Sequence, residues 1–232
     1  MAPTSDPDAP DPDAPDPDAT RTVEQMLAVD ADQRDDAWLR AFHAVVADAP
    51  LVSGDPQLIQ GPDGFGYFAL RIPPPGAITE PFTVRHVERP CTEGGFGCVI
   101  LDRSGETVWV FRYGEMWSLR AEGRFDARPP DDDEWATQVL DEEEVLVAAP
   151  DEAVLPPWAR QVLRNAVGHL DVDEPRVALV VRPAGRPEHS LVLGPLGHVP
   201  AEQRHHLTWY LPRHLGLIYG DDDRWAEASV PL

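Results

Sequence analysis

The sequence predicts an α+β protein of two small lobes, each an antiparallel sheet backed by helices, after a disordered acidic Pro/Asp tail. Three observations support this class. Apolar residues recur at helical spacing in some segments and gather in short strand-like runs in others. Pairs of such runs flank turn signals, as in β-hairpins. The order helix, hairpin, helix, strand occurs twice along 232 residues, a length sufficient for two small domains.

The predicted organisation has four parts. Residues 1–21 form a disordered tail, because the repeated Asp-Pro-Asp-Ala-Pro units lack amide donors at proline and repel one another through aspartate. The tail is expected to be solvating, and docking in a basic groove is the alternative. The N-terminal lobe occupies 22–125 and the C-terminal lobe 156–232. Between them, 126–155 is an acidic linker interrupted by proline.

Helices are expected to open the N-terminal lobe. Thr22 has N-cap chemistry, and Gln25 stands three residues later, the spacing of a capping box. The Asp-rich stretch 30–36 should divide the segment into a short helix and a longer one. The apolar residues at helical spacing, which we assign to the core, are Val23, Met26, Leu27, Trp38, Leu39, Phe42, Val45 and Val46.

Two β-hairpins are predicted in the same lobe. The turn Gly-Pro-Asp-Gly at 61–64 separates the apolar runs 58–60 and 65–72. The turn Arg-Ser-Gly separates 96–102 from 106–113, and these runs are rich in Val, Ile and Trp, which favour strands.

Prolines set the bounds of the other helices. A helix at 83–89 should stop at Pro90, because proline disrupts a helix interior. A second helix should start near Pro157, and a third should open at 200–202 and close at Pro212. The remaining expected elements are a helix at 135–140 and strands at 175–181, 190–193 and 215–219.

Charge restricts the partners that the chain can bind. The formal net charge is −22, and six acids precede the first base, Arg21. Such a chain repels phosphate backbones and anionic lipid, so we expect neither nucleic acid nor a membrane surface as partner. A basic protein surface or a metal ion would be attracted. We expect a protein partner, and nothing in the sequence gives the oligomeric state.

Composition indicates a bacterial, cytoplasmic origin. The basic residues are 19 arginines with no lysine, and Asn165 is the only asparagine, a profile typical of a GC-rich genome. Adaptation to high salt would give a similar profile and stays open. No apolar run reaches the ~18 residues of a membrane span, and the N-terminus lacks the features of a signal peptide.

The sequence contains no recognisable catalytic or cofactor motif. Cys91 and Cys98 are separated by six residues, whereas paired zinc ligands prefer two to four, so free thiols are the favoured interpretation. The glycine clusters at 61–66 and 94–97 match no phosphate-binding loop. The absence of lysine excludes Walker and Schiff-base chemistry. We therefore expect no cofactor and, on balance, no enzyme.

Three sequence blocks occur together: Gly-Pro-Asp-Gly-Phe-Gly-Tyr-Phe at 61–68, Trp-Val-Phe-Arg-Tyr-Gly-Glu at 109–115 and Leu-Thr-Trp-Tyr-Leu-Pro-Arg-His at 207–214. They resemble a family of uncharacterised bacterial cytoplasmic proteins that carries the same blocks in the same order, and this resemblance implies no mechanism. The order of elements is also similar to that of the enhanced-serine-sensitivity protein B family, which implies an interaction-type fold.

Aromatic and arginine side chains in two of these blocks, and just after one of them, are the candidate interaction surface. Trp, Tyr and Arg are the residue types that anchor protein interfaces, although core packing is the plainer reason for buried aromatics. The candidates are Trp109, Arg112, Tyr113, Glu115, Trp117, Trp209, Arg213 and His214.

The favoured hypothesis is a non-enzymatic interaction protein, of adaptor, chaperone-like or immunity type, that binds a more basic partner. One alternative is an enzyme whose site contains His206, Arg213 and His214 with a carboxylate. Another is a small-ligand sensor that uses a cleft between the lobes.

Overall fold

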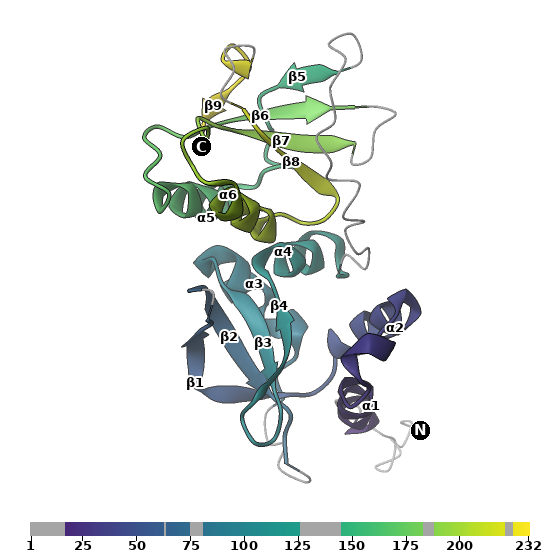
Figure 1. Ribbon diagram of the computed structural model, residues 1–232. Helices are drawn as coiled ribbons and strands as arrows, with labels where there is room; N and C mark the ends of the chain where they lie inside the picture. The colour runs from purple at the N-terminus through teal and green to yellow at the C-terminus, as the bar shows by residue number, and fades with distance from the viewer. Residues whose placement is uncertain (1–16, 63, 75–80, 126–144, 183–187, 221–224) are drawn as a thin grey trace, which may run out of the picture.

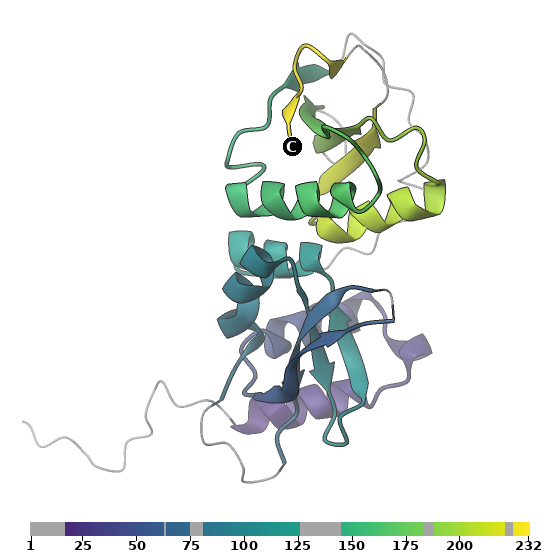
Figure 2. The same ribbon diagram turned by 90° about the vertical axis from the view of Figure 1, so that its left-hand side faces the viewer.

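A computed structural model describes residues 17–62, 64–74, 81–125, 145–182, 188–220 and 225–232. It confirms the α+β class: the described chain forms two lobes stacked on each other, each with a β-sheet and helices (Figures 1 and 2).

The N-terminal lobe consists of α1 (Pro17–Leu27), η1 (Ala31–Gln33), α2 (Asp36–Val46), β1 (Val52–Gln60), β2 (Gly66–Arg71), α3 (Val84–Gly94), β3 (Gly97–Leu101), β4 (Thr107–Phe111) and α4 (Tyr113–Glu122). The strand order is β1-β2-β3-β4. Both predicted hairpins are confirmed, since β1 pairs with β2 and β3 with β4 in antiparallel fashion.

The C-terminal lobe consists of β5 (Leu146–Ala148), α5 (Pro157–Gly168), β6 (Arg176–Val181), β7 (His189–Gly194), α6 (Ala201–His206), η3 (Leu207–Tyr210), β8 (Leu215–Tyr219) and β9 (Val230–Pro231). The strand order is β5-β6-β7-β8, and β9 also pairs with β6.

Both sheets are mixed rather than antiparallel as expected. Strand β2 runs parallel to β3, and β7 runs parallel to β8. In each lobe a helix lies between the two parallel strands along the chain, α3 in one and α6 in the other. Parallel neighbours need such a crossover, whereas a tight turn joins only antiparallel ones.

Several element bounds differ from the sequence prediction. Helix α1 begins at Pro17, so residues 17–21 are helical rather than part of a tail. Thr22 therefore lies inside α1, where its hydroxyl donates to the Asp18 carbonyl at 2.9 Å instead of capping the helix. Residues 1–16 of the predicted tail lie outside the described residues.

Helix α3 continues through Pro90 instead of stopping there. Thr83 caps the helix in a capping box with His86, and Gly95, with φ of 76°, ends it. Proline removes one backbone donor, and the apolar residues Val87 and Cys91 on either side of it are buried, which offsets that loss.

The predicted linker contains structure at its C-terminal end. Strand β5 pairs with β6, and Leu155 is fully buried in the C-terminal core. The helix expected at 135–140 lies outside the described residues. The sequence prediction also lacks α4, whose first residue, Tyr113, falls in a predicted strand, and the two-residue strand β9.

Helix α4 joins the two hydrophobic cores. Met116 and Leu119 pack with the N-terminal sheet and α2, whereas Tyr113 and Trp117 pack with α5, η3 and the second sheet. Figure 2 shows α3 and α4 of one lobe facing α5 and α6 of the other. The lobes therefore meet through a layer of helices rather than through their sheets.

Candidate functional site: the seam between the lobes

An aromatic seam lies where the two lobes meet. We define it by Phe65 from the first hairpin, Arg112 and Tyr113 at the start of α4, and Trp209 and Tyr210 from η3. The Arg112 guanidinium carbon lies 4.2 Å from the centre of the Trp209 ring, in cation–π geometry. The Tyr210 ring centre lies 4.6 Å from that of Phe65 and 5.9 Å from that of Tyr113.

Backbone also meets backbone in this seam. A Cβ atom placed on Gly114 would lie only 2.0 Å from the Leu211 carbonyl oxygen. Glycine is thus needed at this position for the first turn of α4 to approach the segment after η3. The close approach indicates that the lobes are packed directly against each other at Gly114.

The three sequence blocks at 61–68, 109–115 and 207–214 converge at the seam. The first contributes Phe65, the second Arg112 and Gly114, and the third Trp209 and Leu211. Segments far apart in the sequence thus build one contact, and their shared role in the structure is to hold the lobes together.

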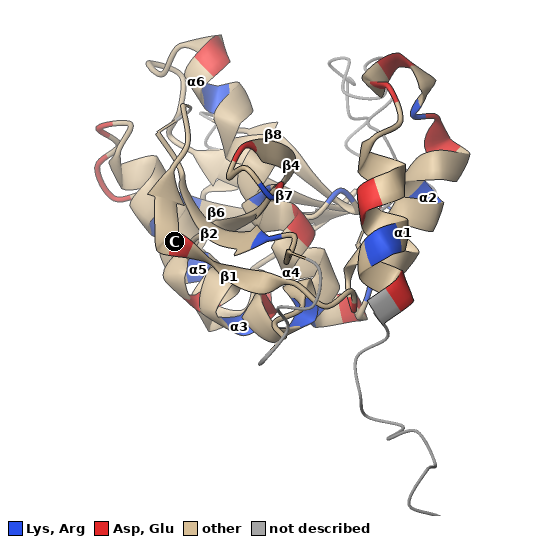
Figure 3. Ribbon diagram, turned by 90° about the horizontal axis from the view of Figure 1, so that it is seen from below, with Lys and Arg blue, Asp and Glu red and all other residues tan. Residues whose placement is uncertain are grey.

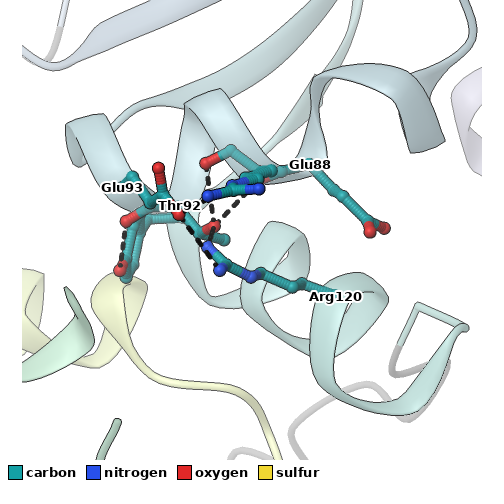
Figure 4. A network of polar contacts seen from close by, with 6 residues as sticks. Glu88, Thr92, Glu93 and Arg120 are labelled. Carbon is teal, nitrogen blue, oxygen red and sulfur yellow. Dashed lines mark hydrogen bonds and ion pairs between the residues drawn. The ribbon is translucent and has the colours of Figure 1, made fainter. Parts of the chain in front are cut away.

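A polar network extends the seam along α3 and α4 (Figure 4). Arg120 donates to the Thr92 hydroxyl at 2.6 Å and to Glu93 at 3.2 Å. The Tyr113 hydroxyl donates to the Thr92 carbonyl at 2.9 Å. The Arg120 guanidinium also lies 4.7 Å from the ring centre of Trp158 in α5, so one arginine connects three helices.

Glu88 borders this network with a perturbed carboxyl group. Burial raises the pKa of Glu88, while the nearby Arg85 and Arg120 oppose that rise. The carboxyl group is therefore easier to protonate than a solvated glutamate. The negative charge of Asp48 also raises this pKa, and Oε2 of Glu88 is buried without a hydrogen-bond partner among the described residues.

Of the eight predicted interaction residues, Trp109 lies apart from the seam. It projects from β4 into the N-terminal core, with its ring centre 4.6 Å from that of Phe42 and 5.6 Å from that of Trp38. The Arg34 guanidinium covers both tryptophans, at 5.1 Å from Trp38 and 5.8 Å from Trp109.

The other predicted residues have identifiable structural roles. Tyr113 and Trp117 are buried, and the Trp117 ring packs edge-on against Trp158 at 5.3 Å. Glu115 accepts a hydrogen bond from the Arg112 backbone amide at 2.9 Å and so caps α4. His214 Nδ1 lies 2.8 Å from Glu122 of α4, another contact between the lobes.

Both cysteines are free and fully buried, in agreement with the sequence interpretation of free thiols. Burial raises the pKa of Cys91 to about 12, and burial together with Cys91 beside it raises the pKa of Cys98 well above its usual value. The thiolate is the reactive form of cysteine, so neither thiol is suited to nucleophilic attack at neutral pH.

The three residues of the alternative enzyme hypothesis, His206, Arg213 and His214, interact with different partners. The His206 ring centre lies 4.5 Å from that of Trp209, and His214 pairs with Glu122. Arg213 acts electrostatically on His43 in the other lobe. Within the described ranges, no group of three or more His, Cys, Asp or Glu side chains is arranged to hold a metal ion.

Sequence reasoning missed several residues that build the seam. Phe65 and Tyr210 lie in the quoted blocks and share their aromatic character, which was the available signal. Trp158 lies in α5, for which the sequence predicts only a start near Pro157, and Arg120 lies in the unpredicted helix α4.

None of the helices in the described ranges has the length and apolar character that crossing a membrane requires.

Comparison with known proteins finds no match among protein-family models, curated proteins or solved structures.

Proposed function

We propose that this chain is a non-enzymatic protein-interaction protein, of adaptor, chaperone-like or immunity type, that binds a more basic protein. The observation that carries the proposal is the placement of acidic residues along the chain. Residues 126–144 contain nine acids and a single base, Arg128, and six acids precede Arg21. Dense acidic runs attract a basic surface over long range and raise the rate of association.

The described surface has a more balanced charge than these runs. Figure 3 shows acids and arginines interspersed on α1 and α2, and exposed ion pairs such as Arg21–Asp18 and Arg85–Asp48 neutralise part of the acidity. The excess negative charge therefore belongs mainly to particular segments of the sequence, which favours local recognition of a basic partner.

The aromatic, arginine and cysteine side chains occupy structural positions, which supports the non-enzymatic proposal over the enzyme alternative. Tyr113 and Trp117 are in the core, and Arg112 stacks on Trp209 across the seam. The two thiols are buried and protonated. Tyr113, Trp117 and the stack of Arg112 on Trp209 stabilise the arrangement of the lobes, so we assign partner binding to the acidic segments rather than to the seam.

The test is affinity purification of the tagged full-length chain from its native lysate at about 50 mM and about 500 mM salt, followed by mass spectrometry. We expect one stoichiometric basic protein that is retained at low salt and lost at high salt, because charge attraction is screened. Two variants localise the effect: the eight acids at 131–134 and 141–144 changed to their amides, and the five tail aspartates at 6–16 changed to asparagine.

Loss of the partner in the first variant supports recognition by the central acidic segment, and loss in the second supports recognition by the tail. Recovery of a bound metabolite or metal in place of a protein would overturn the proposal and redirect attention to a ligand-binding or enzymatic role.

A further inference from the structure

Strand β5 is an exposed edge of the second sheet. It pairs on one side with β6, through Leu146↔Val181, Val147↔Val180 and Ala148↔Leu179. In the part of the chain that the structure describes, no strand pairs with its other side. Figure 1 shows β5 at the outer end of the C-terminal lobe, away from the contact between lobes. Its outer backbone groups are therefore in a position to pair with an added strand.

The side chains of β5 are unusually apolar for such an edge. Leu146 is 65% exposed and Val147 is 36% exposed. Successive strand residues point to opposite faces, so both faces of the sheet carry an exposed apolar side chain at this edge. An added strand would cover these side chains as well as the backbone.

The N-terminal sheet shows how this protein protects another edge. Strand β1 has an irregular register between Ser53 and Leu58, and Pro56 lies within that interval. Bulges, proline and charged residues are the usual means of preventing strand addition. Strand β5 is only three residues long, which itself limits strand addition, but its sequence Leu-Val-Ala has no proline and no charged residue.

The charge around β5 determines which occupant fits. The residues from 129 to 159 contain ten acids and no Arg, Lys or His, and β5 lies in the middle of this stretch. Asp151 and Glu152, which follow β5 closely, are exposed. A second copy of the chain would bring the same acids to the same edge and be repelled, whereas a basic segment would be attracted.

We infer that β5 accepts an extended segment of a basic protein as an additional strand, with apolar residues that alternate with Arg or Lys. Backbone pairing with β5 supplies the affinity, the apolar residues cover Leu146 and Val147, and the basic residues pair with Asp151 and Glu152. This inference rests on the proposed function and specifies where and how the partner binds.

The test uses the full chain and a defined probe, a synthetic peptide of about ten residues that alternates Arg with Val, long enough to exceed a typical strand. Binding is measured by fluorescence anisotropy, and hydrogen exchange of the β5 amides is followed by NMR. A second peptide has the same sequence with N-methylated backbone amides. It keeps the charge and the side chains but loses the donors needed for pairing.

We expect the unmethylated peptide to slow exchange at residues 146–148 and the methylated peptide to bind at least about tenfold more weakly. Leu146→Arg should weaken binding by about tenfold, because it adds a positive charge and removes apolar contact. The matched control is Val110→Arg in β4, also at an exposed position (41%), where the same charge change should have less than about a threefold effect.

Equal binding of the methylated and unmethylated peptides would overturn strand addition and leave charge attraction alone. Equal effects of Leu146→Arg and Val110→Arg would overturn the assignment to β5. Dimerisation through this edge, detected by sedimentation, would show that a second copy is the occupant and would also overturn the inference.

Binding of the native partner to Leu146→Arg distinguishes failure of this inference from failure of the proposed function. If a basic protein is purified with the chain and binds Leu146→Arg as strongly as the unchanged protein, the proposed function stands and the role of β5 fails. If no basic protein binds at all, both fail.

Discussion

His43 is a buried histidine whose ring nitrogens have no hydrogen-bond partner in the described structure. It lies in α2 among aromatic rings, with Phe125 at 4.9 Å and Phe111 at 6.0 Å between ring centres. Burial, with a contribution from the positive charge of Arg213, lowers the pKa of His43 to about 4. The folded protein thus holds this ring neutral at pH values where an exposed histidine is charged.

This histidine predicts a loss of stability in acid. Between about pH 6.5 and pH 4 the unfolded chain binds a proton at His43 and the folded chain does not, so the free energy of unfolding falls as pH falls. The loss should reach about 2–3 kcal/mol near pH 4.5. Urea unfolding of the protein and of His43→Phe at pH 7.5 and 4.5 measures it. The stability difference between the two proteins should change with pH by this amount, and a pH-independent difference would contradict the assignment.

Replacing Gly114 by alanine is expected to lower the free energy of unfolding, which is opposite to the usual effect of this change in a helix. Alanine normally stabilises a helix relative to glycine. At position 114, however, the added methyl would overlap the Leu211 carbonyl, so Gly114→Ala should lower the free energy of unfolding by about 3 kcal/mol. Gly168→Ala in α5 is the control, because a Cβ there meets no atom within 4 Å and should be neutral or stabilising by up to about 1 kcal/mol. Chemical denaturation of both variants gives the comparison, and similar effects at the two positions would argue against a close approach at the seam.

At the scale of elements, local patterns were sufficient for most of the fold. The turn at 61–64 and the apolar runs beside it correctly predicted the hairpin β1–β2, and Pro157 marked the start of α5. The parallel pairs β2–β3 and β7–β8 were missed because they join segments separated by a helix, and no local pattern records that contact.

Helix α4 was missed for a different reason. Trp109, Phe111 and Tyr113 continue a period-two pattern, but the strand ends at Phe111 and Tyr113 already belongs to the helix. The N-terminal cap from Glu115 determines this change of direction, and sequence reasoning did not detect it. Because the sequence prediction lacks α4, it places Tyr113 and Trp117 on a surface. In the structure, both side chains extend from α4 and are buried against the other lobe.

The network around α3, α4 and α5 predicts that arginine is needed at position 120. Lysine would keep the charge but lose the planar group that lies over Trp158 and donates to Thr92 and Glu93 together. Arg120→Lys should therefore lower the free energy of unfolding by about 1 kcal/mol. Arg89→Lys, at a largely exposed arginine that also pairs with Glu93, should change it by less than about 0.5 kcal/mol. Equal losses in the two variants, measured by urea unfolding, would mean that stacking on Trp158 contributes nothing.

At the scale of the whole molecule, α4 makes the two lobes energetically dependent on each other. Its residues Met116 and Leu119 complete one core, and Tyr113 and Trp117 complete the other. A helix cannot unfold in one lobe and stay folded for the other, so the lobes are expected to unfold together as one cooperative unit. In this respect the molecule differs from two independent domains joined by a linker.

Trp117→Ala tests this dependence, because its side chain belongs to a helix of the N-terminal lobe but packs in the C-terminal core. Removing a buried tryptophan should cost about 3–5 kcal/mol, and cooperative unfolding transmits that cost to both lobes. Native-state hydrogen exchange of the buried strands β3 and β7 provides one probe in each sheet. Both strands should exchange with the same free energy in the unchanged protein and lose the same amount in the variant. If β7 alone loses protection while β3 keeps its original value, the lobes are energetically separate, and the seam serves to orient them rather than to stabilise them.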